Sequence, residues 1–353
     1  MAGAPHPDPG STGEYGSDVI DRARSLDKSG LHACCFSLRD LVVQAYFSDP
    51  DYADLCTRNL AQAPARAPQS DPDLTLYLLD SESLGWPRPR RWTGEFSRSS
   101  VRAELKPAGL RGAYLHEPCV WQFHSDRLRV GAQLIDRPGA LPLWESGGPL
   151  RAFLHWAYAA RDRQLCHAAT LGLDGHGILL VGPGGSGKSG TTLAGIAGGL
   201  STVGDDYCLV GQGERVTAYP LFHILKQDPA GVARALGASA SRAFGPLNWQ
   251  GKHEIHAGML RPSPFTGALA IDAIIVPRVA RQARSRFRPI SPGHAMRALA
   301  PSSAFQLPDG ESRGIAFAAT LCRRLPCLEL QLSDHAAEIS ATLCEFLSRR
   351  RHD

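Results

Sequence analysis

One run of eight residues, 182–189, has the types and spacing needed to hold phosphate groups. It reads Gly-Pro-Gly-Gly-Ser-Gly-Lys-Ser and satisfies the pattern G-x-x-x-x-G-K-[S/T]. The glycines let backbone N–H groups turn inward around an anion, and a helix that starts here adds its own unpaired N–H groups. The pattern predicts a nucleoside triphosphate site, with Lys188 on the β- and γ-phosphates and the Ser189 hydroxyl on Mg²⁺. The residues expected to contact the nucleotide are Gly182, Gly184, Gly185, Ser186, Gly187, Lys188, Ser189 and Gly190. A glycine-rich turn without phosphate is the alternative.

Two adjacent carboxylates follow this glycine-rich segment. Asp205 comes 17 residues after Lys188, and Asp206 comes next, where a short predicted strand ends. Adjacent carboxylates repel each other unless a metal ion or a proton offsets their charge. In phosphoryl transfer one carboxylate typically holds Mg²⁺, and another accepts the proton of the attacking hydroxyl. A solvated acidic turn is the alternative interpretation of the pair.

The elements around the glycine-rich segment have the order that this pattern requires. An apolar run at residues 177–181 predicts a strand before the loop, and small residues at 191–200 predict a helix after it. Further strands are expected at residues 207–210, 216–219 and 270–276, and a closing helix at 334–347. These elements predict an α/β nucleotide-binding domain over residues 149–353.

The residues before this domain differ from it in composition and pattern. Residues 1–16 are rich in Gly, Pro and Ser, which predicts a disordered tail, and residues 17–72 predict short helices and a linker. Strand-like runs separated by turn residues predict a smaller antiparallel-sheet domain over residues 73–148. The whole chain is therefore expected to be α/β, with a smaller N-terminal α+β domain and a phosphate-loop domain.

The composition narrows the function classes. A net charge of +4 over 353 residues, without a basic stripe interleaved with aromatic residues, argues against a nucleic-acid partner. Nine scattered cysteines without metal-ligand spacing indicate a reducing compartment. We expect a cytoplasmic protein without a membrane partner, because the sequence contains neither a secretory signal nor an apolar run of spanning length. Two basic runs, 88–91 and 281–288, are either solvated loops or a docking patch for an acidic partner.

Three features together resemble the catalytic domain of bacterial HPr kinase/phosphorylase. They are the loop at 182–189, the Asp205-Asp206 pair, and His167, which stands 21 residues before Lys188. In that family a His and an Asp-Asp pair have these same spacings. The stretch 167–207 more specifically resembles the HPr-kinase-related serine kinase branch, which includes lasso-peptide precursor kinases. A close resemblance covers about residues 165–210, and a looser one extends to the C-terminus.

The resemblance implies an HPr-kinase-like fold, ATP and Mg²⁺ as cofactors, and a role for each matching residue. Asp206 matches the general base that accepts the proton of the acceptor hydroxyl, and Asp205 would lie beside the metal with Ser189. His167 matches the His that keeps this base ionised. The acceptor implied is a Ser of a peptide or small protein, and the family's oligomers leave a homo-oligomer open.

The sequence also departs from the family. The Glu-Arg-Gly segment of HPr kinase/phosphorylase is absent, because the comparable region reads Phe-His-Ile-Leu-Lys-Gln-Asp at residues 222–228. We therefore expect a kinase without phosphorylase activity. Lys226, in this region, is expected to supply positive charge to the transition state. A half-exposed lysine beside a turn is the alternative.

Three functions remain open from the sequence. The first is an ATP-dependent serine kinase that acts on a peptide. The second is a kinase with a small-molecule acceptor, such as a sugar or a natural-product alcohol. The third is a nucleotide-dependent switch, which the adjacent Asp pair and His167 disfavour, because a switch typically carries a single acidic residue at this place.

Overall fold

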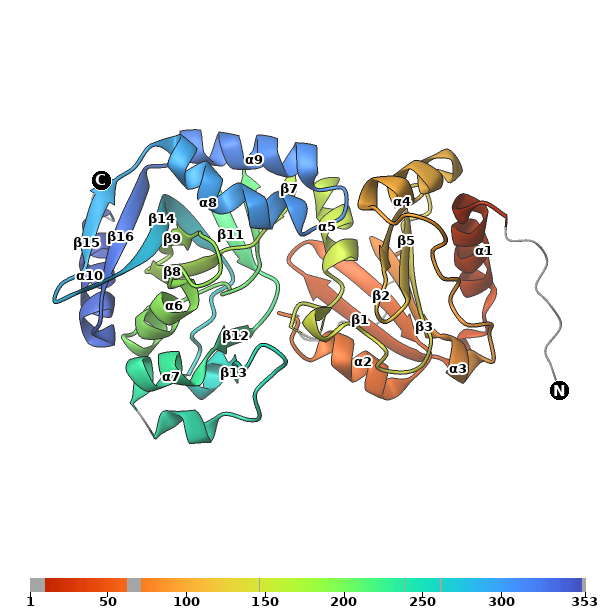
Figure 1. Cartoon of the computed structure of the whole chain (residues 1–353), viewed down its shortest axis with the longest axis horizontal. Coiled ribbons are helices and arrows are strands. Elements are labelled where there is room, and N and C mark those ends of the chain that lie inside the picture. The colour runs from red at the N-terminus through yellow and green to blue at the C-terminus, as the bar shows by residue number, and fades with distance from the viewer. Residues whose placement is uncertain (1–9, 62–70, 146, 238, 261, 351–353) are drawn as a thin grey trace. The chain divides into compact units, whose positions relative to one another are not determined.

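The computed structural model describes the chain except residues 1–9, 62–70, 146, 238, 261 and 351–353 (Figure 1). The chain divides into two compact units. The first comprises Met1–Arg58 and Gln62–Ala157, and the second comprises Asn59–Ala61 and Tyr158–Asp353. The expected tail at 1–9 and most of the expected linker lie outside the described residues.

Within the described residues of the first unit, six strands form one mixed sheet in the order β1-β2-β3-β6-β5-β4. The strands are β1 (His32–Leu38), β2 (Leu41–Phe47), β3 (Leu74–Asp80), β4 (Arg111–Leu115), β5 (Val120–Ser125) and β6 (Val130–Ile135). The helices are α1 (Thr12–Ser25), α2 (Pro50–Thr57), α3 (Ser81–Leu84) and α4 (Arg98–Leu105). Helix α5 (Arg151–Ala159) crosses the division between the units, which falls later than the boundary expected at residue 148.

The first unit corrects three expectations. Residues 12–16 are helical instead of disordered, because Ser11 and Glu14 form a capping box that starts α1. Residues 32–47 form the β1–β2 hairpin, although only short helices were expected there. Arg39 in its two-residue turn has a φ of 55°. Such turns usually carry Asn-Gly, and the sequence lacks that signal here. The sheet is mixed instead of antiparallel, because β3 pairs in parallel with both β2 and β6.

The second unit contains the glycine-rich segment. Eight of its described strands form a mixed sheet, and two more form a separate antiparallel ribbon. The strands of the large sheet are β7 (Arg163–Cys166), β8 (Ala169–Leu173), β9 (His176–Leu180), β10 (Cys208–Gln212), β11 (Val216–Pro220), β14 (Leu269–Gln282), β15 (Arg286–Pro289) and β16 (Cys327–Ser333). The ribbon consists of β12 (Ile224–Gln227) and β13 (His253–His256).

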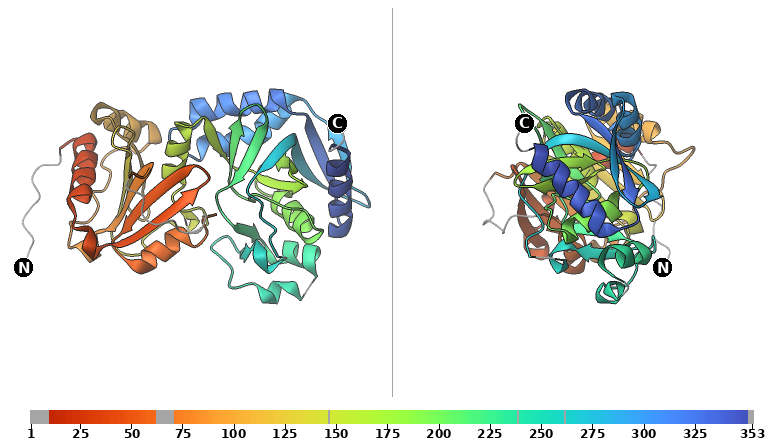
Figure 2. Two further views of the ribbon diagram at one scale, coloured as in Figure 1. Left: turned by 180° about the vertical axis from the view of Figure 1, so that it is seen from behind. Right: turned by 90° about the vertical axis from the view of Figure 1, so that its left-hand side faces the viewer.

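Helices cover both faces of the large sheet (Figures 1 and 2). The helices of this unit are α6 (Lys188–Ala197), α7 (Pro229–Leu236), α8 (Pro292–Phe305), α9 (Glu311–Arg324) and α10 (Ala336–Arg350). Alternate residues of β9 face opposite sides, as in any strand. Leu179 packs in a core with α8 and α9, while Ile178 and Leu180 pack in a core with α6 and α10. Two apolar layers therefore fix β9, and with it the start of the loop that follows.

The described residues include no helix with the length and apolar character that a membrane crossing requires.

Candidate active site

The glycine-rich loop connects β9 to α6 at the end of the parallel part of the sheet. β9 pairs in parallel with β14, and the Val181 N–H extends this contact by donating to Ile275 O at 2.9 Å. Gly187 precedes α6 with φ 105°, and a Cβ atom there would lie 2.6 Å from Leu332 Cδ1. The left-handed backbone favours glycine at this position, and a larger residue would also force the Leu332 side chain to shift.

The start of α6 is suited to binding an anion. No side chain caps this helix, and the first N–H groups of a helix have no partner within it. Lys188 is 8% exposed, and its Nζ donates to Gly182 O at 2.6 Å and to Pro183 O at 3.1 Å. Burial lowers the pKa of Lys188, and the charges of Asp205 and Asp206 partly oppose this shift. A buried ammonium group thus lies within the loop, next to unpaired amides.

Two threonines hold the segment before the Asp pair. The Thr202 hydroxyl donates to Thr170 O at 2.8 Å, and the Thr170 N–H donates to Gly204 O at 2.9 Å. Isolated bridges and a bend occupy this place, where the sequence predicted a short strand ending at the pair. Hydroxyl-to-backbone bonds replace the strand ladder here, and they aim Asp205 and Asp206 toward α6 and β12.

Asp205 is a buried carboxyl group near the loop helix. It is 3% exposed, and its Oδ2 accepts a hydrogen bond from the Lys226 N–H at 3.3 Å. Its Oδ1 is buried without a well-formed hydrogen bond. Burial raises the pKa of Asp205, and the charge of Asp206 raises it further, while the Ser189 and Thr192 hydroxyls lower it. An incompletely bonded carboxyl oxygen beside a serine hydroxyl fits the hard oxygen ligands that Mg²⁺ prefers.

This burial predicts that Asp205→Asn increases thermal stability while it harms the site. The folded-state pKa lies above the ordinary value of 3.8, so the folded protein loses stability as pH rises from 3.8 through that higher pKa. Removing the charge should therefore raise Tm by a few degrees at pH 7. The gain should shrink as pH falls toward 3.8, where the wild-type carboxyl is also neutral. Tm measured by calorimetry from pH 4 to pH 8 checks this.

Asp272→Asn is the matched control for this stability experiment. Asp272 accepts from His176 Nδ1 at 2.9 Å and from Arg215 at 3.2 Å, so its negative charge is paired. We expect its Tm at pH 7 to fall. A lower Tm for Asp205→Asn at pH 7 would contradict the cost assigned to the buried Asp205 charge.

Asp206 lies between a histidine and a lysine. Its Oδ1 is 2.8 Å from His167 Nε2, and its Oδ2 is 3.2 Å from Lys226 Nζ. The side chain of Asp206 is 28% exposed, that of His167 17% and that of Lys226 14%. The three therefore line an accessible but partly desolvated position. The positive charge of Lys226 stabilises the carboxylate form of Asp206.

Contacts from α8 and from Tyr207, just before β10, hold His167 in place. His167 lies in the bend between β7 and β8. Its backbone N–H donates to Ser303 Oγ at 3.0 Å, and its ring lies 5.1 Å from the Tyr207 ring. The Tyr207 hydroxyl donates to Gln306 at 2.8 Å. Sequence reasoning missed these supports, although Ser303 and Gln306 fall in a segment that loosely fits the kinase branch.

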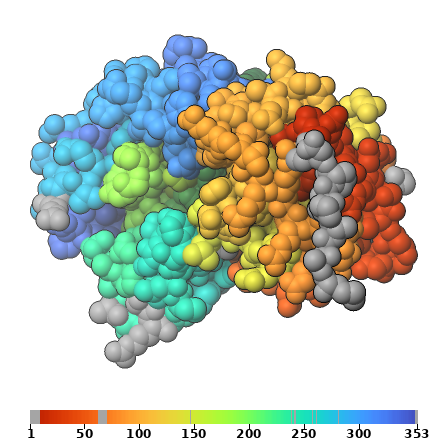
Figure 3. Space-filling view, turned by 45° about the vertical axis from the view of Figure 1, so that its right-hand side comes forward, coloured from red at the N-terminus to blue at the C-terminus, as the bar shows by residue number. Residues whose placement is uncertain are grey.

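The structure thus brings the candidate residues together in two groups. His167, Asp206 and Lys226 are in direct contact, and Asp205 lies near Ser189 and the Lys226 backbone. The Lys188 amine contacts the loop carbonyls and neither carboxylate directly. In the space-filling view, the green surface around the loop segment lies between the teal β12–β13 segment and the blue C-terminal helices (Figure 3).

The described residues contain no group of three or more His, Cys, Asp or Glu side chains arranged to hold a metal ion. Ser189 and Asp205 would therefore supply only part of a Mg²⁺ shell. In phosphoryl transfer this is ordinary, because Mg²⁺ takes one or two protein ligands and completes its shell with phosphate oxygens and water.

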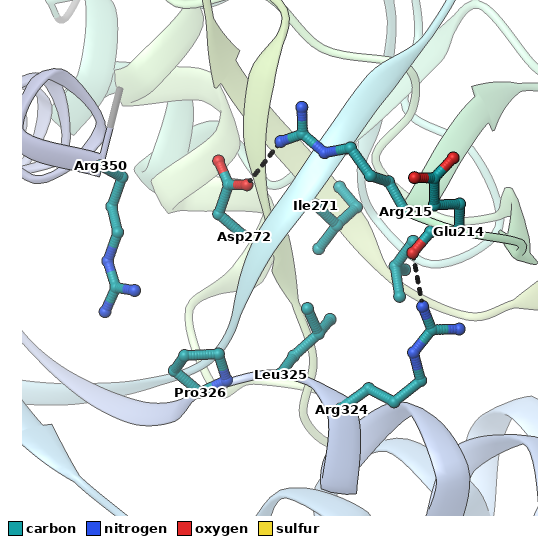
Figure 4. Close-up of a pocket in the computed structure, with 9 residues that line it drawn as sticks. Glu214, Arg215, Ile271, Asp272, Arg324, Leu325, Pro326 and Arg350 are labelled. Carbon is teal, nitrogen blue, oxygen red and sulfur yellow. Dashed lines mark hydrogen bonds and ion pairs between the residues drawn. The ribbon is translucent and has the colours of Figure 1, made fainter. Parts of the chain in front are cut away.

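A separate cavity of about 340 Å³ lies at the other end of the sheet (Figure 4). Ile271 lines this cavity and pairs with Gly177 at the start of β9. The glycine-rich loop follows the other end of β9. Two of its arginines already have partners: Arg215 pairs with Asp272, and Arg324 donates to backbone carbonyls that include Glu214 O.

One solved structure shows a weak likeness to this chain. The chain is a mixed α/β protein. A solved structure of the Hpr(Ser) kinase/phosphatase from Coxiella burnetii is similar to it over 54% of this chain and 96% of that chain, with 15% identity and a TM-score of 0.28. A likeness this weak does not bear on the site, whose chemistry rests on the distances above. A scan against protein-family models finds no match, and neither does a search of curated proteins.

Proposed function

We propose that the second unit is an ATP- and Mg²⁺-dependent kinase that transfers the γ-phosphoryl group to a hydroxyl group. The observation that carries this proposal is the position of Asp206, whose carboxylate contacts both His167 and Lys226 beside the buried Asp205. A partly exposed carboxylate held by a histidine and a lysine, in the same unit as a glycine-rich loop, fits the transfer of a phosphoryl group to a hydroxyl better than a switch.

The loop and α6 would hold the phosphates. The unpaired amides at the start of α6 and the Lys188 ammonium supply positive potential at one place. Ser189 and Asp205 would hold Mg²⁺, which when bound neutralises charge on the phosphates. Burial and the charge of Asp206 raise the pKa of Asp205, and a bound cation would offset the cost of its buried negative charge.

Asp206 would act as the general base. It would accept the proton of the attacking hydroxyl, and its contact with His167 fixes its orientation. Lys226 would stabilise negative charge near the transferring group, while it also holds Asp206 in the carboxylate form. Most of the rate enhancement would come from this positioning and from charge neutralisation.

The acceptor we propose is a Ser of a peptide or small protein. The resemblance of residues 167–207 to the serine kinase branch supports this choice, and the 28% exposure of Asp206 leaves the base within reach of a large acceptor. A small-molecule alcohol is the second candidate, because it would need the same base and the same nucleotide contacts.

Transfer of label from [γ-³²P]ATP tests this proposal. The wild-type protein is incubated with Mg²⁺ and either seryl peptides or sugars and other alcohols. Acid-stable label on a seryl peptide, lost in Asp206→Asn, would support the peptide kinase. Label on a sugar or alcohol alone would move the assignment to the small-molecule acceptor. ATP hydrolysis that requires Lys188 but continues unchanged in Asp206→Asn would contradict a kinase and favour the switch.

The contact between His167 and Asp206 predicts a partial loss of activity when His167 is replaced. His167→Ala should lower kcat by about 10- to 100-fold, a smaller loss than for the base itself, because the carboxylate loses its orienting partner but remains present. KM for ATP should change little, since His167 does not contact the loop. Steady-state kinetics with a validated acceptor measures both parameters.

His176→Ala is the matched control, because His176 forms a similar 2.9 Å contact with Asp272 at the opposite end of β9. We expect its kcat to match the wild type. Equal kcat values for His167→Ala and the wild type would return His167 to a purely structural role.

A further inference from the structure

Lysines are rare in this chain. Five of its 38 basic Lys and Arg residues are lysines, and the second unit holds Lys188, Lys226 and Lys252. A lysine ammonium is a compact point charge on a flexible stem, which suits contact with a phosphate oxygen. Two of these three lysines already lie in the candidate site, so the position of Lys252 is of interest.

The β12–β13 ribbon determines the direction of Lys252. Lys226 of β12 pairs with Glu254 of β13, and their neighbours Leu225 and Ile255 are buried in the core with α6. Side chains alternate along a strand, so Lys226 and Glu254 lie on the opposite face of the ribbon. Lys252 comes two residues before Glu254, and continued alternation places it on the same side as Lys226. That side faces Asp206.

The end of the ribbon next to Lys252 lies close to the first turn of α6. His253 pairs with Gln227, and Gln227 Nε2 lies 3.3 Å from the position that a Cβ atom on Gly190 would occupy. The positive charges of Lys252 and Lys188 are close enough to interact.

The ammonium group of Lys252 has no hydrogen bond or ion pair within the described part of the chain, whereas those of Lys188 and Lys226 are bonded. Only its backbone N–H bonds, to Asn248 Oδ1 at 3.1 Å. Glu254 accepts instead from the Asn248 side chain at 3.3 Å. Like charges near the loop repel each other until an anion lies between them.

We propose that Lys252 binds the terminal phosphate of the nucleotide, and this rests on the nucleotide binding proposed above. Lys188 and the α6 amides form the base of the phosphate site, and Lys252 adds a cation from the β12–β13 ribbon. The site then has three lysines for the negative charge of a triphosphate. A diphosphate, which lacks the terminal phosphate, leaves Lys252 without a partner.

Calorimetric titration with two nucleotides tests this contact. A non-hydrolysable ATP analogue and ADP, each with Mg²⁺, are titrated into the wild type and into Lys252→Met, which keeps an unbranched stem but removes the charge. Loss of one charge-assisted contact should raise the Kd of the ATP analogue about tenfold and leave the Kd of ADP within about twofold. Lys252→Arg should recover part of the affinity. Lys106→Met, at an exposed lysine of the first unit, should match the wild type.

Each outcome separates this contact from nucleotide binding itself. A selective loss for the ATP analogue supports the contact with the terminal phosphate. Equal losses for both nucleotides, or no loss, would overturn it while the proposed function stands. A wild-type protein that binds neither nucleotide would overturn both.

Discussion

Lys188→Ala should reduce phosphoryl transfer by about 100- to 1,000-fold, the range seen when one donor to a developing negative charge is removed. The Lys188 amine is buried and is held by the carbonyls of Gly182 and Pro183, so it lies within the loop before any phosphate arrives. Its removal takes away the cation that the loop encloses. The rate of transfer from [γ-³²P]ATP should fall, and the Kd for Mg·ATP should rise.

Two variants separate the charge of Lys188 from its packing. Lys188→Met keeps most of the stem that α6 buries and should lose activity like the alanine variant. Lys106→Ala removes an exposed lysine from the first unit and should keep full activity. Wild-type transfer by Lys188→Met would show that the loop does not use its lysine, and the phosphate site would then have to lie elsewhere.

Asp206→Asn should abolish transfer, with a loss of about 100- to 10,000-fold in kcat, and keep nucleotide binding. The amide has the size of the carboxylate and can still bond to His167 or Lys226, so the local structure should persist. It cannot accept the acceptor's proton. Single-turnover transfer and equilibrium binding of Mg·ATP, measured on the same preparation, check both halves of this expectation.

The neighbouring carboxylate provides the contrast for Asp206. Asp205→Asn should lower activity through weaker Mg²⁺ binding, so that a higher Mg²⁺ concentration restores part of the rate. Added Mg²⁺ should not rescue Asp206→Asn. Full activity of Asp206→Asn would assign the base to another residue, and rescue of both variants by Mg²⁺ would make both carboxylates metal ligands.

The parts of the site that depend on local sequence could be predicted well. The strand before the loop, the helix after it and the closing helix lie close to the expected positions, as β9, α6 and α10. Short-range chemistry explains this, because glycines, a small-residue helix and a β-strand signal each act within a few residues. The spacing of His167 and Asp206 carried information only through the family resemblance.

The tertiary supports could not be predicted from the sequence. Ser303 lies 136 residues from His167, and its hydroxyl gives no sign of its partner. The approach of Lys252 to α6 depends on the register of β12 and β13, which is set only by their pairing. In the first unit, Arg39 takes the left-handed position of the hairpin turn where Gly or Asn is usual, so β1 and β2 were missed.

Equilibrium binding of Mg·ATP is the most direct test of the central claim, because it does not require the acceptor to be known. Calorimetric titration of the wild-type protein should show saturable binding with a Kd below about 1 mM, which weakens when Mg²⁺ is removed and is lost in Lys188→Ala. Absence of binding, or equal binding by the wild type and Lys188→Ala, would contradict the assignment of residues 182–190 as a triphosphate site.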